Sequence, residues 1–309
     1  MGNIVKATIL GQEYSLVYNS SAGAYEAVVT APSDSSYQYN SDHYFPVTIS
    51  ATDEAGNVTT ISDTQGDFKE FLKLYAKEQI KPTITEISPS NGAYIGTSNP
   101  LIKFTVLDNS NGQSSGFSGI NPASISLTIG GTTIDAASIT RKSITGGYEC
   151  SYTPSTALKD GSCTITITAA DYDGNYSEPA VVTFTVDTIP PVLDVTSPEG
   201  DIMTNSKKVI VSGKTSDASA SPVTVEIKVN GTSQGTATVS ADGSFSKEVE
   251  ISEGVNTVTI ISTDKAGKSS SVTRMVTLKT SGPIFKTVTL SPNPVNCGTT
   301  YTITVTFEE

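Results

Sequence analysis

The chain has 309 residues, a formal net charge of -12 and a pI near 4.6. Only 16% of its residues are charged, and it is rich in Val, Ile, Thr and Ser, a composition that suits pleated strands more than helices. We therefore predict an all-β protein of two or three domains. The acidic balance argues against nucleic acid or an anionic membrane surface as a partner, since both reward clustered Lys and Arg.

Residues 1–65 are predicted to form a small antiparallel unit, because short alternating segments are separated by Gly, Asn and Ser. The clearest strand is VTISATDEAGN at 47–57, in which the alternation leads to Asp53 and a Gly three positions later. Tyr37 and Tyr39 lie among small polar residues in SDSSYQYNSD, a composition common in adaptable contact surfaces. They are candidate recognition residues for a host-surface glycan or protein, and packing within the unit is the alternative.

A helix over 67–79 is predicted within a linker that spans 66–81. Apolar residues recur there at the i, i+3, i+4 and i+7 spacing of an amphipathic helix, at Phe68, Phe71, Leu72 and Tyr75. Lysines recur every four residues and would form a positive stripe that suits an acidic partner, at Lys69, Lys73 and Lys77. The alternative is the solvated face of a spacer helix.

Residues 82–187 and 188–280 are each predicted to form a complete domain. Each range holds seven short strand candidates with turn signals between them, a spacing typical of a Greek-key sandwich. The joint VDTIPP at 186–191 is short and contains two prolines, so it predicts a stiff connection.

The strand-and-turn pattern at 47–57 returns at 165–175 and at 258–268, which predicts three related modules. Alignment on Asp53, Asp171 and Asp264 indicates that the first module begins at the third strand of the plan. It therefore lacks the first two strands.

Residues 281–309 have the pattern of those two strands. One strand is predicted near 287–290, and a second has alternating apolar residues, at Tyr301, Ile303, Val305 and Phe307. Because an isolated two-stranded hairpin is marginal in water, we predict that it completes the first module of another chain. Closure within one chain and an independently packed or truncated tail are the alternatives.

Three features carry a family resemblance: VDTIPPVLDVTSP at 186–198, a Gly ten residues before the repeated Asp, and the D-x-x-G-N turn. With them the chain resembles tandem bacterial immunoglobulin-like repeats. Such repeats occur in bacterial surface proteins and in tail or baseplate proteins of phages and phage-like particles. The resemblance implies tandem immunoglobulin-like β-sandwiches that serve as spacers and interaction platforms.

Catalytic patterns are sparse, and the chain is expected not to be an enzyme. The single His, His43, has no Ser or Cys motif around it, and phosphate-binding loops, HExxH and CxxC pairs are lacking. Cys150 and Cys163 alternate with apolar residues, which predicts buried free thiols, with a bridge between them as the alternative.

Calcium is the one candidate cofactor. Asp108 follows the second strand of its domain, and the loops after the second and sixth strands of a sandwich lie at the same end. Asp108 is therefore expected to approach Asp171 and Asp173, and such oxygen ligands suit calcium. The alternative is that Asp171 only bonds the backbone of its own turn, because the other two copies have Ala55 and Ala266 in place of Asp173.

These patterns predict a structural subunit of a phage tail, baseplate or tail-like particle. Its partners would be copies of itself or other particle subunits, joined by strand complementation. No signal peptide or bilayer-spanning segment is evident, so synthesis in a host cytoplasm is expected. The alternatives are a stalk fragment of a bacterial surface adhesin and a carbohydrate-binding module that uses the Tyr-rich N-terminal unit.

Overall fold

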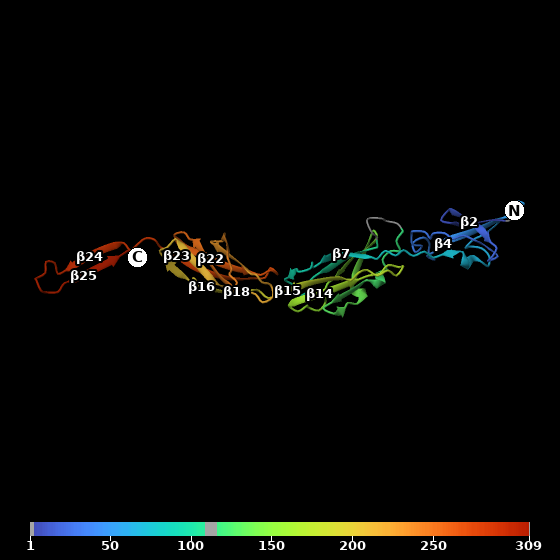
Figure 1. Cartoon of the computed structure of the whole chain (residues 1–309). Coiled ribbons are helices and arrows are strands. Elements are labelled where there is room, and N and C mark those ends of the chain that lie inside the picture. Colours follow the sequence, from blue (N-terminus) through green and yellow to red (C-terminus); the bar gives the residue numbers. More distant parts are fainter. Residues whose placement is uncertain (1–2, 109–115, 309) are drawn as a thin grey trace. The chain divides into compact units, whose positions relative to one another are not determined.

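The computed structural model describes residues 3–108 and 116–308, and strands dominate these ranges (Figure 1). The predicted all-β class is confirmed. The chain divides into two compact units, Met1–Ala93 with Thr97–Thr185 and Tyr94–Gly96 with Val186–Glu309. Among the described residues, no helix has the length and apolar character needed to cross a bilayer.

The described N-terminal residues form a single sheet with the strand order β3-β2-β1-β4-β5. Its strands are β1 (Ile4–Ile9), β2 (Gln12–Asn19), β3 (Ala24–Glu26), β4 (Phe45–Thr52) and β5 (Val58–Ile61). Leu10 and Gly11 connect β1 to β2 with positive φ angles of 52° and 77°, a geometry that matches the twist of a tight hairpin. The central strand β4 places Ile49 opposite Ala7 on β1 and Ile61 on β5.

The helix predicted over 67–79 is not formed, and this part of the prediction is wrong. The segment contains a short 3₁₀ helix, Lys69–Phe71, followed by the strand β6 (Lys73–Leu74), which pairs with the start of β4. Three of the four residues that suggested a helical face are exposed, namely Phe68, Phe71 and Tyr75. Burial instead follows a period of two through Leu72, Ala76 and Glu78, because the segment lies along a sheet edge.

The first complete sandwich has two antiparallel sheets. One has the order β12-β13-β9-β7, and the other contains β11-β10-β14-β15. Buried side chains from both sheets form the core, including Phe104 on β9, Ile165 on β14 and Phe184 on β15. The elements are β7 (Thr83–Ser88), β8 (Tyr94–Ile95), β9 (Ile102–Leu107), β10 (Ser126–Ile129), β11 (Thr132–Thr133), β12 (Thr140–Ile144), β13 (Gly147–Tyr152), β14 (Gly161–Thr168), β15 (Ala180–Val186) and 3₁₀ turns at Pro122–Ser124 and Ala136–Ser138.

The second sandwich pairs a sheet of order β16-β18-β21 with one of order β17-β23-β22-β19-β20. Val211, Ile227 and Ile260 lie in one apolar core shared by the two sheets. The strands are β16 (Val192–Ser197), β17 (Ile202–Thr204), β18 (Lys208–Ser216), β19 (Thr224–Val229), β20 (Thr232–Ala237), β21 (Ser244–Glu250), β22 (Gly254–Thr263) and β23 (Ser269–Leu278).

The C-terminal strands β24 (Phe285–Ser291) and β25 (Thr302–Phe307) pair with each other as a two-stranded sheet. Every residue of both strands is exposed.

The cysteines behave as predicted. Cys150 on β13 and Cys163 on β14 are buried free thiols in different sheets, and Cys297 is an exposed free thiol. Burial raises the pKa of the Cys150 thiol to about 11.

Candidate functional site

The hairpin β24–β25 has one apolar face and one hydroxyl face. Its register pairs Val288 with Val305 and Leu290 with Ile303, so apolar side chains lie opposite one another on one face. Six of them are between 38% and 66% exposed: Phe285, Val288, Leu290, Ile303, Val305 and Phe307. The opposite face, which we call the threonine face, carries hydroxyl residues at its paired positions, namely Thr287, Thr289, Ser291, Thr302, Thr304 and Thr306. The apolar face is therefore the one that a partner would cover. Tyr301, which precedes β25, is exposed as well.

The N-terminal sheet also leaves an apolar face open. Ala7 pairs with Ile49 and Ile9 pairs with Val47, and these four side chains are only half-buried. In the first sandwich the equivalent pairs are Leu127 with Ile167 and Ile129 with Ile165, and all four of these are buried. The difference arises because a second sheet covers the sandwich face. The described residues of the N-terminal unit provide none.

The segment after β3 corresponds to β13, which lies beside β9 in the first sandwich. Val28 in this segment is fully exposed, since the described residues place no strand beside it. The hairpin matches the strands that are missing there. β7, β16 and β24 each end in a Ser that is followed by Pro, at Ser88, Ser197 and Ser291. The hairpin thus has the sequence of a module's opening strands.

The candidate recognition tyrosines differ in their contacts. The Tyr37 ring stacks on His43 at a centroid distance of 3.8 Å and on Tyr172 at 4.3 Å. Two rings this close and parallel must cover opposite faces of Tyr37, so neither face is open to a ligand. Tyr39 packs edge-on against Phe45 and remains half-exposed.

The predicted lysine stripe is largely engaged with the chain itself. Lys73 pairs with Glu70 at 2.7 Å, and the Lys77 ammonium donates to the backbone carbonyl of Asp173 at 3.1 Å. Lys69 lies in the short 3₁₀ helix, so it does not share the face of an α-helix with Lys73 and Lys77.

The candidate calcium residues are only partly brought together. Carboxylate oxygens of Asp108, Asp171 and Glu78 lie within 4.8 Å of one another. Asp173 does not join them, because its carboxylate accepts a hydrogen bond from the backbone N–H of Glu78 at 3.0 Å. Sequence reasoning missed Glu78 because it placed that residue at the end of a helix. The acid-x-Ile-x-Pro pattern at both domain joints, from Glu78 and from Asp187, was the available signal.

Burial controls the charge of this cluster, which we call the first acidic triad (Glu78, Asp108 and Asp171). Loss of hydration, together with the hydrogen bond and charge of Asp171, raises the pKa of Glu78 to about 7. Burial, with the charge of Asp171, raises the pKa of Asp108 to about 6. The Asn175 amide donates to Asp171 at 2.7 Å and to Glu78 at 3.1 Å, which offsets part of the charge.

The donor set of the first acidic triad fits calcium, which prefers carboxylate oxygens at roughly 2.3–2.6 Å. Two ligands of one ion are at most roughly 5 Å apart, and the oxygens of the triad all lie within 4.8 Å of one another, which is compatible with a shared ion. Asp108 Oδ1 is also buried without a hydrogen-bond partner among the described residues. Calcium here remains a prediction.

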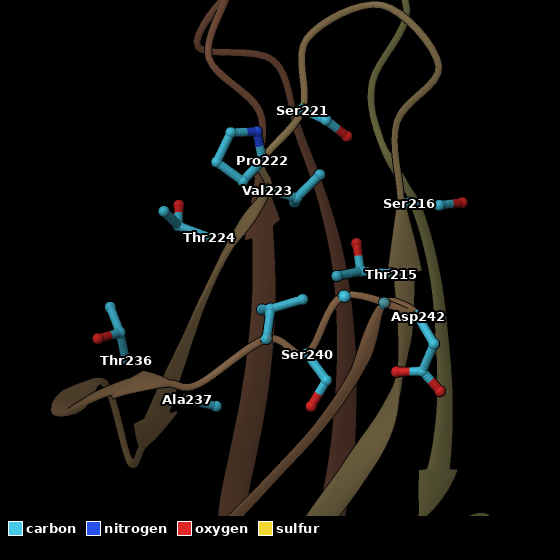
Figure 2. Close-up of a pocket in the computed structure, with 13 residues that line it drawn as sticks. Thr215, Ser216, Ser221, Pro222, Val223, Thr224, Thr236, Ala237, Ser240 and Asp242 are labelled. Atoms are coloured by element: carbon cyan, nitrogen blue, oxygen red, sulfur yellow. The ribbon is translucent and has the colours of Figure 1, made fainter.

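A pocket of about 730 Å³ lies in the second sandwich, between the loop before β19 and the β20–β21 connection (Figure 2). Hydroxyl groups and small apolar side chains line it, and Asp242 provides its carboxylate. That carboxylate accepts hydrogen bonds from the backbone and side chain of Ser244. The pocket has no imidazole or thiol lining it, so it lacks a nucleophile–base pair of the usual kinds.

Two sheets of mainly antiparallel strands around a shared core, in this strand order, define immunoglobulin-like β-sandwiches. Residues 191–280 match the family model of glucodextranase domain B, which confirms the immunoglobulin-like resemblance for the second sandwich. A 128-residue stretch is 30% identical to Bacillopeptidase F of Bacillus subtilis (strain 168). This match covers 41% of the present chain and only 8% of that protein.

Solved structures with similar architecture include the fibronectin(III)-like modules of Clostridium thermocellum CbhA, at 18% identity and a TM-score of 0.43. That match covers 64% of this chain and 94% of the other. Domains A168–A170 of titin match at 14% identity and a TM-score of 0.43, covering 89% of this chain and 87% of the other.

Proposed function

We propose that the protein is a non-enzymatic structural subunit whose copies join by strand complementation. The hairpin β24–β25 of one copy supplies the two opening strands to the N-terminal sheet of the next. One observation carries this proposal: the chain exposes an uncovered apolar sheet face and, at the hairpin, an uncovered apolar ribbon with the sequence of the missing strands.

The first sandwich provides the template for the joint. There β9 lies between β13 and β7, and Ile102, Phe104 and Val106 of β9 are buried against the opposite sheet. In the proposed joint, β25 lies beside the segment around Val28, and its apolar face covers Ile49 and its neighbours on β1 and β4. The threonine face remains in water, as the outer face of a sandwich does.

The energetics favour this joint. Full burial of an aliphatic or aromatic side chain stabilises by roughly 1.5–3 kcal/mol, and six such side chains lie on the hairpin face. Hydrogen bonds along a new strand pair add to this gain. Because these six side chains are between 38% and 66% exposed in the free hairpin, only about half of that gain is available. The loss of translational and rotational freedom costs roughly 4–15 kcal/mol, so association also depends on burying the facing residues of β1 and β4.

The setting that we propose for such a subunit is a phage tail, baseplate or related particle. A second candidate is a stalk segment of a longer bacterial surface protein. It is favoured because the matched stretch forms 8% of the much longer Bacillopeptidase F. Neighbouring tail genes support the first setting, whereas a reading frame that encodes an export signal and a wall anchor supports the second.

A pair of adjacent substitutions tests the joint. Val305→Asp places a charge on the apolar face of β25, and Thr304→Asp places the same charge on the threonine face. We expect the mass of the wild type, measured by analytical ultracentrifugation, to increase with protein concentration. The Val305→Asp variant should remain a monomer at the same concentrations. The second should assemble like the wild type. A wild-type chain that stays monomeric at every concentration, or two variants that assemble equally, would contradict the proposal.

A rearranged chain distinguishes specific strand complementation from nonspecific hydrophobic association. Residues 283–309 are moved ahead of residue 3 through a short Gly/Ser linker, and the chain then ends at residue 282. We expect a monomer in which β1 and β4 gain protection from amide hydrogen exchange, because the module is completed within one chain. Unchanged protection of these strands would show that the hairpin does not fit this sheet.

A further inference from the structure

A second group of acidic side chains lies in the second unit. Asp187 follows β15, Asp217 follows β18, and Asp264 begins the turn after β22. Carboxylate oxygens of the three residues lie within 4.8 Å of one another, although the residues are far apart in sequence. We call this group the second acidic triad. The repeated strand-and-turn pattern points to a turn at Asp264 and does not reveal this cluster.

Backbone N–H groups orient each carboxylate of the second acidic triad. Asp187 Oδ1 accepts from Ile189 at 3.2 Å, and Asp264 Oδ1 accepts from Lys268 at 2.9 Å. Asp217 Oδ1 accepts from Ala220 at 2.6 Å. In this way one oxygen of each acid is held by its own loop, and the direction of each carboxylate is set before any ligand binds.

The second oxygens of two of these acids have no partner. Asp187 Oδ2 and Asp264 Oδ2 are buried and lack a hydrogen bond within the described part of the chain. The residues are 0% and 7% exposed, respectively. A buried carboxylate oxygen without a hydrogen-bond partner is destabilising, because nothing replaces the hydration that it has lost. The second acidic triad contains two such oxygens, so we looked for a ligand that would satisfy both.

Among the described residues, no ion pair offsets the charge of the second acidic triad. The ion pairs found between described residues do not include Asp187, Asp217 or Asp264. Burial is the main cause of a raised pKa at Asp187, and the charges of Asp217 and Asp264 and a side-chain hydrogen bond with Asp217 also raise it. The chain therefore gathers three acidic side chains in a desolvated place, and no described cation pairs with them.

Comparison with the first acidic triad makes an accidental cluster a poor explanation. The two triads are built from matching positions. Each contains the acid of an acid-x-Ile-x-Pro joint, an acid that directly follows β9 or β18, and the acid of the repeated turn. In the first, the Asn175 amide bridges two of the carboxylates. Lys268 takes the place of Asn175 in the second triad, and its side chain lies against Gly96. The second triad thus keeps the acids but lacks the bridging amide.

We propose that Asp187, Asp217 and Asp264 bind a divalent cation of the calcium type. Each acid contributes the oxygen that its loop does not use, and water completes the six to eight oxygen ligands that calcium takes. The ion ties the joint at 187–189 to two loops of the second sandwich. Magnesium fits less well, because it demands near-ideal octahedral geometry and gives up its water reluctantly.

Calcium alone, added to chelator-treated full-length protein, tests this site. Titration calorimetry and thermal melting are carried out in an Asp108→Asn background, which disables the first acidic triad. We expect one saturable binding event and a rise in the melting temperature of the second unit. Asp217→Asn should weaken this binding about tenfold or more, since Asn preserves the turn hydrogen bond but removes the ligand charge.

Glu199→Gln is the matched control, because Glu199 is an exposed acid of the same unit. It should bind calcium as the parent protein does. Asp187→Asn provides a second loss-of-ligand variant on a different loop, and circular dichroism verifies that each variant is folded. Absence of calcium binding in the parent protein, or folded Asp187→Asn and Asp217→Asn variants that bind calcium as tightly as the parent, would overturn the proposal.

Discussion

Glu78 occupies a place in which a charged carboxylate is costly. It is buried beside Asp108 and Asp171, and its own backbone N–H is used by Asp173. Its pKa of about 7 means that the folded protein holds a proton there that the unfolded chain releases near pH 4.5. The residue therefore links protonation to folding.

Stability in calcium-free buffer is expected to fall as the pH rises from about 4.5 to about 7. The reason is that the folded state binds more protons than the unfolded state in this range, so raising the pH favours unfolding. Above about pH 7 this contribution should be constant. Glu78→Gln should remove the part of the decline between about pH 6 and 7, because Asp108, with a pKa of about 6, still contributes below that. The exposed Glu199→Gln should preserve the whole decline. Urea midpoints measured across this pH range check the prediction, and parallel profiles for all three proteins would refute it.

The extended segment that follows the 3₁₀ helix Lys69–Phe71 shows how a sheet edge overrides a helical pattern. The first residues of β4 offer unpaired backbone groups, and β6 satisfies them through the Phe45–Leu74 pair and the Val47 N–H to Leu72 carbonyl bond. Ser36 holds the next part of the extended segment in place, because its hydroxyl donates to the Ala76 carbonyl and accepts from the Ala76 N–H.

Ser36→Ala is expected to destabilise the N-terminal sheet by roughly 1–3 kcal/mol, since it leaves the buried Ala76 N–H without its acceptor. Ser20→Ala, at an exposed loop position, should have little effect. Chemical denaturation monitored by tyrosine fluorescence measures the difference. If the segment were a helix independent of Ser36, the two variants would be equally stable.

The predictable parts of the fold are those that local pattern determines. Alternation and Gly turns predicted most strands of both sandwiches, but not the short strands β8 and β17. The repeated Asp predicted the turn in which Asp171 bonds Asn175. The edge of β4 could not be foreseen, because it depends on which distant strands leave it unpaired. Glu78 was missed for the same reason, whereas Asp108 and Asp171 were found because both follow strands at the same end of a sandwich.

The whole molecule consists of two compact units with separate cores. Phe184 is buried in the first unit, and Ile260 is buried in the second. Cores that share no side chains need not unfold together, so a single unfolding free energy does not describe such a chain.

Differential scanning calorimetry is expected to show two transitions. Phe184→Ala should destabilise the first unit by roughly 3–5 kcal/mol and lower the temperature of its transition. Ile260→Ala should destabilise the second unit by roughly 2–5 kcal/mol and lower the temperature of the other transition. Calcium should raise the transition that Ile260→Ala lowers. A single transition that both substitutions shift equally would show that the units unfold as one.

The all-exposed hairpin also affects the solubility of the free chain. β25 reads TITVTF, six residues without charge, Pro or Gly, and such segments are prone to stack with their own copies into fibrillar zippers. The net charge of -12 opposes that stacking, because it keeps copies apart through repulsion. The acidic surface thus protects an aggregation-prone strand, and salt or a pH near the pI of 4.6 removes that protection.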